Sequence, residues 1–179
     1  MDFLELAKKR QSTRDYSPKV VPRESIDRCI EAARLAPSAC NSQPWSFIVV
    51  DREPMRTKLA SGAFGGIYAM NSFAKKAPVF IVVITERAPY ITRLGGYLKG
   101  VQYSLIDIGI ACEHLILEAE ELGMGTCWLG WFDERFVKNL LKVPKDKKVD
   151  VIISMGYPEE GRLRDKSRRP LDEIRRFAE

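Results

Sequence analysis

Apolar residues recur at helical spacing in five stretches of the chain and form short continuous runs in four others. Repeats of three and four residues predict amphipathic helices, and short runs rich in β-branched residues predict buried strands. The predicted helices span residues 2–11, 23–35, 98–122, 133–142 and 171–178. The predicted strands span residues 46–51, 78–85, 126–129 and 149–155. Because helices and strands are interspersed, the chain should fold into layers of both kinds around one core.

The longest predicted helix, residues 98–122, carries apolar residues in alternating steps of four and three. These residues are Val101, Leu105, Ile108, Cys112, Leu115, Ala119 and Leu122. Such spacing is typical of a helix that packs along another helix. Further apolar residues lie outside this stripe, so more than one side of the helix should be covered. Two interpretations stay open: a central core helix, and a helix shared between the core and a subunit interface.

Residues 61–71, between the first two predicted strands, contain several glycines and no steady hydrophobic period. This composition predicts a mobile loop or a broken helix. The chain has no G-x-G-x-x-G spacing after a strand, which excludes the common dinucleotide-binding fingerprint.

Length and composition narrow the class of protein. The 179 residues fit one domain spanning positions 1–179. No apolar run reaches the roughly 18 residues that suggest a membrane helix, and the N-terminus lacks the pattern of a secretory signal. We therefore expect a cytoplasmic protein with no membrane partner. Four scattered cysteines and a single histidine argue against a metal site and against a disulfide framework.

The chain has a net charge of +5 and a pI near 9.0. Its basic residues are mixed with acids, apart from a concentration at 162–169, and they do not alternate with aromatic residues. This distribution argues against nucleic acid as a partner. A modest positive excess instead suits an anionic cofactor.

Two polar stretches are hard to explain as ordinary core or surface. The first, Arg10-Gln11-Ser12-Thr13-Arg14, places cations and hydroxyls at the end of the first predicted helix. The second, residues 36–45 with the sequence APSACNSQPW, is a polar loop that leads directly into a strand. Cations and hydroxyl donors suit a phosphate, and side-chain amides suit the polar edge of a planar ring. Together the stretches predict a site for a cofactor that carries both groups.

Flavin mononucleotide (FMN) is a cofactor of this kind. The residues of the right type for its phosphate are Arg10, Ser12, Lys166 and Arg168. The residues suited to its ring are Arg14, Asn41 and Gln43 along the pyrimidine edge, and Pro37 with Ser38 on one face.

Four motifs occur in order along the chain. They are Arg10-x-Ser12-x-Arg14 followed by Tyr16, then Ala36-Pro37-Ser38-x-x-Asn41-Ser42-Gln43-Pro44-Trp45-x-Phe47, then ELGMGTCWLG at 121–130, and finally Lys166-x-Arg168. In this order they resemble the nitroreductase family of FMN-dependent oxidoreductases, over nearly the whole chain. The resemblance implies an α+β fold, a three-layer sandwich with a central, mostly antiparallel sheet between helices. It also implies an intertwined homodimer with the long helix at its interface and two FMN sites built from both subunits.

The resemblance also assigns roles to residues. Arg10, Gln11, Ser12 and Arg14 bind the ribityl phosphate and the pyrimidine edge of FMN, and Lys166 and Arg168 complete the phosphate site. A loop from the other subunit, with Pro37, Ser38, Ala39 and Asn41, lies against the flavin. The backbone of Leu129 or Gly130 lies near flavin N5; many longer relatives have an acidic residue at the position of Leu129, which leaves only backbone contact there. Asn71 is a further candidate for the flavin edge, and a turn asparagine is the alternative.

The function implied is an oxidoreductase that uses NADH or NADPH to reduce electron-poor acceptors, such as nitroaromatics or quinones, by a ping-pong mechanism. No catalytic side chain is expected, because the flavin carries the chemistry. Trp128 and Trp131 flank the Leu129–Gly130 backbone, where either one could border the substrate or serve in packing. Two alternatives are another reaction on the same fold, either dehalogenation or flavin fragmentation, and a non-catalytic flavin-binding module.

Overall fold

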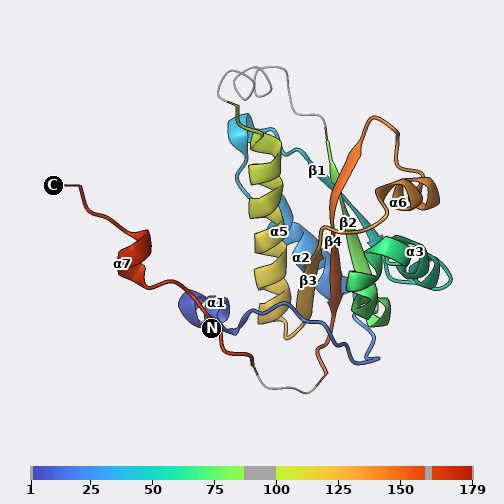
Figure 1. Cartoon of the computed structure of the whole chain (residues 1–179), viewed down its shortest axis with the longest axis horizontal. Coiled ribbons are helices and arrows are strands. Elements are labelled where there is room, and N and C mark those ends of the chain that lie inside the picture. The colour runs from blue at the N-terminus through green and yellow to red at the C-terminus, as the bar shows by residue number, and fades with distance from the viewer. Residues whose placement is uncertain (1, 87–99, 160–162, 179) are drawn as a thin grey trace.

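A four-stranded sheet lies between two groups of helices in the computed structural model, which describes residues 2–86, 100–159 and 163–178 (Figure 1). The strands are β1 (Trp45–Val50), β2 (Val79–Thr85), β3 (Gly125–Leu129) and β4 (Lys148–Gly156). Their order across the sheet is β1-β2-β4-β3, and all neighbours are antiparallel. The four predicted strands and the α+β class are confirmed.

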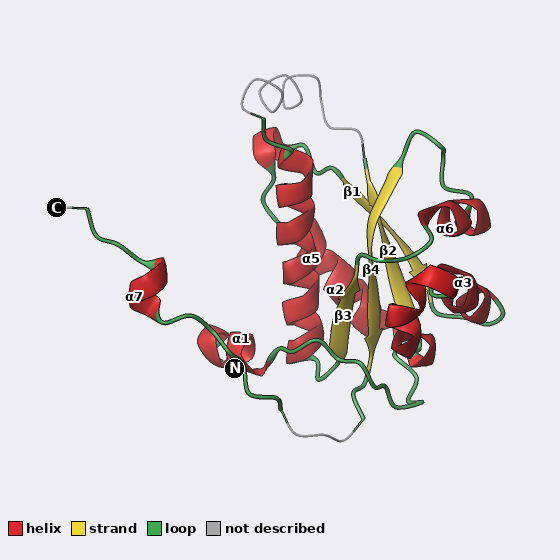
Figure 2. Cartoon of the chain, viewed as in Figure 1, coloured by secondary structure: helices red, strands yellow, loops and turns green. Residues whose placement is uncertain are grey.

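The α-helices of the described part are α1 (Phe3–Lys9), α2 (Arg23–Arg34), α3 (Met55–Ala63), α5 (Tyr103–Glu121), α6 (Glu134–Leu141) and α7 (Leu171–Ile174). Two short 3₁₀ segments, η1 (Ala39–Asn41) and η2 (Gly66–Lys76), join them (Figure 2). The five predicted helices are present, but α7 stops four residues early and α5 begins at Tyr103. Residues 98 and 99, where that helix was expected to begin, lie outside the described ranges.

The segment between β1 and β2 differs most from the prediction. Helix α3 was not predicted. It ends at Ala63, Gly65 is extended, and η2 follows, in which Asn71 departs from helical geometry with φ −98° and ψ 16°. The broken-helix interpretation of residues 61–71 is therefore the correct one.

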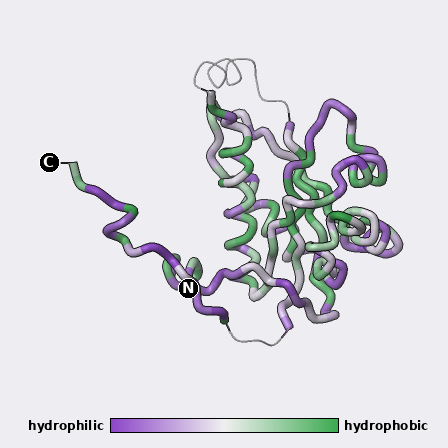
Figure 3. The backbone as a smooth tube through the Cα atoms, in the orientation of Figure 1, coloured by the Kyte–Doolittle hydropathy of each residue, from purple (hydrophilic) through white to green (hydrophobic). Residues whose placement is uncertain are grey.

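Each face of the sheet carries its own hydrophobic core. On β2, Ile81 and Val83 face the cluster shared with α2 and α5, while Phe80 and Val82 face the cluster shared with α3 and α6. This alternation follows from the two-residue period of a strand whose faces are both covered. The chain thus forms three layers, as predicted, and its hydrophobic segments concentrate in the sheet while the C-terminal tail is mostly hydrophilic (Figure 3).

Helix α5 is a core helix on one side only. Ile108, Cys112 and Leu115 are buried against the sheet and α2. On another side, Leu105 and Ile106 are 44% and 51% exposed. The core interpretation of this helix is confirmed, and its role at a subunit interface stays a prediction. No helix in the described ranges combines the length and hydropathy of a membrane span.

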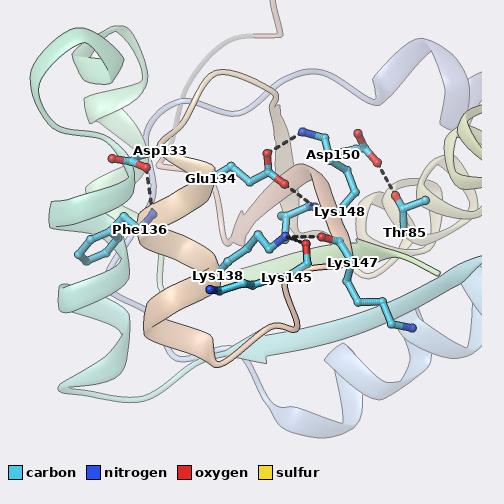
Figure 4. Close-up of polar contacts among 10 residues, drawn as sticks. Thr85, Asp133, Glu134, Phe136, Lys138, Lys145, Lys147, Lys148 and Asp150 are labelled. Atoms are coloured by element: carbon cyan, nitrogen blue, oxygen red, sulfur yellow. Dashed lines mark hydrogen bonds and ion pairs between the residues drawn. The ribbon is translucent and has the colours of Figure 1, made fainter. Parts of the chain in front are cut away.

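Polar contacts tie α6 to the start of β4 (Figure 4). The carboxylate of Glu134 accepts hydrogen bonds from Lys148 Nζ at 2.6 Å and from the backbone N–H of Val149 at 3.1 Å. Lys138 Nζ donates to the carbonyl oxygens of Lys145, at 2.9 Å, and Lys147. These contacts fix the strand that lies next to β3, at whose edge the candidate site is found.

Candidate functional site

The segment that follows α1 runs along the free edge of β3. Ser12 pairs with Thr126 in a parallel bridge, and the backbone N–H of Thr13 donates to the carbonyl oxygen of Thr126 at 2.8 Å. Thr13 can lie this close because residue 125 is glycine: a Cβ there would lie 2.1 Å from Thr13 Oγ1. The Thr13 side chain is buried, whereas Arg14 is exposed. The first polar stretch, residues 10–14, is therefore an edge segment that is bridged to β3 at Ser12 and displays Arg14 at the edge of the sheet.

A buried tyrosine holds the end of this segment. Tyr16 Oη donates to the carbonyl oxygen of Thr13 at 2.9 Å and lies 2.8 Å from Ser154 Oγ on β4. Burial raises the pKa of Tyr16 well above its ordinary value, so the phenol keeps its proton and remains a donor. Thr13 is thus anchored to two strands, β3 and β4.

A pocket of about 600 Å³ opens beside the segment. Its cationic lining residues are Lys9, Arg14, Lys76 and Arg164, and its acidic ones are Asp15, Glu120 and Glu159. Ser12 and Gln11 add a hydroxyl and an amide. The guanidinium of Arg14 lies 5.9 Å from the centre of the Phe73 ring. The pocket therefore offers positive charge, polar donors and one aromatic wall.

The C-terminal tail contributes to the same pocket. Arg164 donates to Gln11 Oε1 from its backbone N–H at 3.2 Å and from Nε at 3.4 Å, and its Nη2 donates to the carbonyl oxygen of Ser12. Lys166 Nζ donates to carbonyl oxygens at the end of α1, at 3.0 Å for Ala7. Burial, with the neighbouring cations Arg10 and Arg168, lowers the pKa of Lys166.

Arg10 and Arg168 each lie close enough to Lys166 to lower its pKa, and the phosphate site expected of these three residues stays a prediction. The hydrogen bond recorded for Arg168 is to the carbonyl oxygen of Ser167, at 2.7 Å. Arg164, which makes the most direct contact with residues 11 and 12, was not among the predicted site residues. The basic concentration at 162–169 was the only sequence signal for it.

Helix α1 is fastened to the C-terminal half of α5. Lys9 Nζ lies 3.8 Å from Glu120 Oε1, and Arg10 Nε lies 3.8 Å from Glu113 Oε1. Burial raises the pKa of Glu120, and the nearby Lys9 opposes that shift. Figure 1 accordingly shows α1 beside the lower end of α5.

The second polar stretch lies toward the other end of α5. Asp107, in the first turns of that helix, accepts hydrogen bonds from the Ala39 N–H at 3.0 Å and from Ser42 Oγ at 3.4 Å. Thirteen residues separate Asp107 from Glu120, which corresponds to about 20 Å along a helix. The structure thus brings residues 10–14 and 164–168 together but keeps the Pro37–Gln43 loop away from them within one chain.

The end of β3 is braced by η2. Asn71 Nδ2 donates to the carbonyl oxygen of Trp131 at 2.9 Å, and Trp131 Nε1 donates to the carbonyl oxygen of Ile67 at 3.0 Å. The rings of Tyr68 and Trp131 lie 5.3 Å apart. Leu129 is buried and Gly130 is exposed, so a contact at this point would come from backbone. The proposed role of Asn71 at a flavin edge stays a prediction.

Comparison with known proteins identifies the family of the chain. The sequence pattern of the Nitroreductase family matches residues 7–157. The chain belongs to this family. It is 36% identical, over 164 residues, to a protein of Archaeoglobus fulgidus named NADH dehydrogenase/NAD(P)H nitroreductase, in an alignment that covers 89% of this chain and 87% of the relative. A protein of the same name from Methanothermobacter thermautotrophicus is 33% identical over 164 residues, with 89% and 79% covered.

Solved structures of nitroreductase family proteins share the fold. A family protein from Clostridium novyi NT has a TM-score of 0.77 and 31% identity, covering 89% of this chain and 87% of that one. An FMN-dependent nitroreductase from Clostridium difficile R20291 has a TM-score of 0.70 and 29% identity, covering 96% and 94%. A more distant relative is the iodotyrosine deiodinase of Thermotoga neapolitana, 26% identical over 176 residues, with 87% and 88% covered.

The nitroreductase chain has a donor set that fits FMN. Arg10, Lys166 and Arg168 gather near the end of α1 and suit a phosphate. Arg14 and Ser12 project from the edge of β3 into one pocket, where they suit the ribityl chain and the ring edge. Gly123 also lines the pocket, and a Cβ at this position would meet nothing within 4 Å, so the backbone is open to a cofactor there.

Proposed function

We propose that this nitroreductase is an FMN-dependent enzyme that takes electrons from NADH or NADPH and reduces electron-poor small molecules, such as nitroaromatics or quinones. The observation that carries the proposal is the edge segment bridged to β3, in which Ser12 and Arg14 line one pocket and Arg10 lies at the end of α1. The relatives named NAD(P)H nitroreductase and FMN-dependent nitroreductase support the same activity.

Each residue group has a part in holding the cofactor. Arg10, Lys166 and Arg168 bind the phosphate, and Ser12 with Gln11 donates to the ribityl chain. Arg14 lies at the pyrimidine edge, where its positive charge stabilises the negative charge of the reduced ring. When bound, FMN supplies two-electron chemistry, accepting electrons from the nicotinamide donor and passing them to the acceptor in a ping-pong cycle. Leu129 and Gly130 contribute backbone near the reacting edge.

The active form is proposed to be a homodimer. The two halves of the site lie about 20 Å apart along α5 of one chain, so a second copy must bring its Pro37–Gln43 loop to the edge segment. Apolar residues are exposed on the elements that would meet that copy: Phe3, Leu4, Leu105, Ile106, Leu171, Ile174 and Phe177. The tail that bears the last three extends away from the body of the chain (Figure 1). Exposed apolar surface of this extent is typical of protein interfaces. We propose the cytoplasm as its location.

The first test is reconstitution. Purified protein mixed with FMN should retain it through gel filtration, elute as a dimer, and lose its flavin absorbance when NADH or NADPH is added without oxygen. Arg14→Ala should weaken FMN binding and slow that bleaching. Arg52→Ala, which removes an exposed arginine after β1, is the matched control and should leave both unchanged. A protein that stays colourless with FMN would refute the proposal.

The same experiment separates the alternatives. Flavin that binds but is not bleached by either nicotinamide would identify a non-catalytic flavin-binding module. The deiodinase relative gives the dehalogenation alternative a specific basis. Rates of NAD(P)H oxidation with a nitroaromatic, a quinone and a halogenated phenol would distinguish these reactions, and we expect the first two to be faster.

A further inference from the structure

The Pro37–Gln43 loop is held in an unusual backbone conformation. Cys40, Asn41 and Gln43 have φ values of 52°, 52° and 43°. These values lie in the left-handed region, which residues other than glycine adopt rarely. Three such residues within four positions form a strained segment, and strain of this kind persists only where surrounding contacts hold it.

Hydrogen bonds within the loop hold part of this left-handed backbone conformation. The backbone N–H of Gln43 donates to Ser38 Oγ at 2.9 Å, and Gln43 Nε2 donates to the carbonyl oxygen and Oδ1 of Asn41 at 3.2 Å and 3.1 Å. These bonds shape the loop. Because they join residues of the loop to one another, they do not fix where the loop lies on the protein.

The side-chain contact that joins the loop to α5 is Asp107. This residue is only 3% exposed. Its Oδ1 accepts from the Ala39 N–H at 3.0 Å, and its Oδ2 accepts from Ser42 Oγ at 3.4 Å. No ion pair of Asp107 is recorded in the described ranges, so its recorded partners are both in the loop. A buried carboxylate is unfavourable unless its oxygens are hydrogen-bonded. The loop supplies one donor for each oxygen of Asp107, from Ala39 and from Ser42.

We propose that Asp107 is a positioning residue of the cofactor site: it holds the Pro37–Gln43 loop, already in its strained shape, where the loop can meet FMN bound by the partner subunit. The inference rests on the proposed function. The Ala39 N–H donates to Asp107, so it is not free to donate to the flavin. A contact with the flavin would therefore come from the exposed Pro37 and Asn41 side chains rather than from that backbone donor.

Two substitutions at position 107 separate hydrogen bonding from charge. Asp107→Ala removes both acceptors. Asp107→Asn keeps an oxygen for the Ala39 N–H, and its NH₂ can donate to Ser42 Oγ, because a hydroxyl accepts as well as donates. Cys112→Ala, a fully buried change about one and a half turns further along α5, is the control for general destabilisation.

The readouts are the FMN dissociation constant from flavin fluorescence, the visible circular dichroism of bound flavin, and hydrogen exchange at the Ala39 amide. We expect Asp107→Ala to raise the dissociation constant at least about tenfold, as loss of a hydrogen bond to a charged group implies, and to change the dichroism. Asp107→Asn should stay within about threefold of the wild type, since it keeps the main bond. Cys112→Ala should bind FMN normally while melting at a lower temperature.

Normal FMN affinity and dichroism in folded Asp107→Ala would overturn the inference, and so would equal losses in the Ala and Asn variants. If Asp107→Ala does not fold, the wild-type protein still tests the point: the Ala39 amide should exchange slowly, and fast exchange would refute its bond to Asp107. This readout needs no flavin. A wild-type protein that fails to bind FMN would therefore refute the proposed function separately.

Discussion

Gly125 is the position where a single methyl group should disturb both stability and cofactor binding. An added Cβ would lie 2.1 Å from Thr13 Oγ1, 2.7 Å from Thr13 Cβ and 2.9 Å from Thr13 Cγ2, whereas ordinary contacts begin at 3.4 Å. In Gly125→Ala, the edge segment around Thr13 must move outward by roughly 1.3 Å. That shift breaks the 2.8 Å hydrogen bond from the Thr13 N–H to the carbonyl oxygen of Thr126.

The magnitude follows from these two effects. Overpacking costs about 1–3 kcal/mol, and a lost backbone hydrogen bond costs about 1 kcal/mol. For a chain of this length, each kcal/mol lowers the melting temperature by about 2–4 °C, so a total cost of about 2–4 kcal/mol implies a loss of about 4–16 °C. Ser12 and Arg14 move with Thr13, so FMN binding should weaken by about 10-fold to 100-fold, as expected when hydrogen bonds to charged groups are displaced.

Thermal unfolding without FMN and fluorescence titration with FMN measure the two quantities. Thr13→Gly removes all three clashing atoms. The double variant Thr13→Gly/Gly125→Ala should therefore lose less stability than the sum of the losses in the two single variants. Unchanged melting and unchanged FMN affinity in Gly125→Ala would refute the packing of this segment on β3. A double variant whose effects are simply additive would refute the direct contact with Thr13.

Three further predictions concern other parts of the fold. Gly62→Ala places a Cβ 2.1 Å from the Phe136 ring; it should destabilise the protein by about 1–3 kcal/mol without changing FMN affinity, which denaturant unfolding and titration would check. In native protein a thiol reagent should label Cys40 alone quickly, because the other three thiols are buried and burial raises their pKa; a second fast thiol would contradict the packing. The Arg23 guanidinium holds the pKa of Asp51 below its usual range. The ion pair of Asp51 with Arg23 therefore stabilises the fold at pH values above the pKa of Asp51 in the unfolded chain, and this stabilisation is lost as the pH falls through its pKa in the folded protein. Asp51→Asn should therefore be less stable than the wild type at neutral pH and should approach it in acid, measured by denaturant midpoints at both pH values.

The sequence predicts most of this architecture because the strands and long helices have regular hydrophobic periods. Helix α3 escapes prediction for a physical reason: its buried residues are mainly small, and its interior contains Gly62. That glycine lowers local helix propensity. Its position is explained by the Phe136 ring of α6, a contact across more than 70 residues that no local pattern records.

The sequence points to the candidate site through a family motif. Gln11, Ser12 and Arg14 of that motif line one pocket, and their part in binding FMN stays a prediction. Within the basic tail, however, the choice between Arg164 and Arg168 depends on how the chain folds back onto Gln11. The anchoring role of Asp107 is likewise absent from the sequence pattern, because an aspartate inside an otherwise apolar helix gains its meaning only from the loop that covers it.

The attachment of residues 12–16 to β3 and β4 has a consequence for synthesis. Its partners Thr126 and Ser154 lie more than 110 residues further along the chain, and Gln11 meets Arg164 across 153 residues. Because a chain is synthesised from its N-terminus onward, this segment has no sheet to join until β3 and β4 have both been made. The segment that carries Ser12 and Arg14 therefore waits, unpaired, for strands that are synthesised long after it, and the cofactor site is one of the later parts of the fold to form.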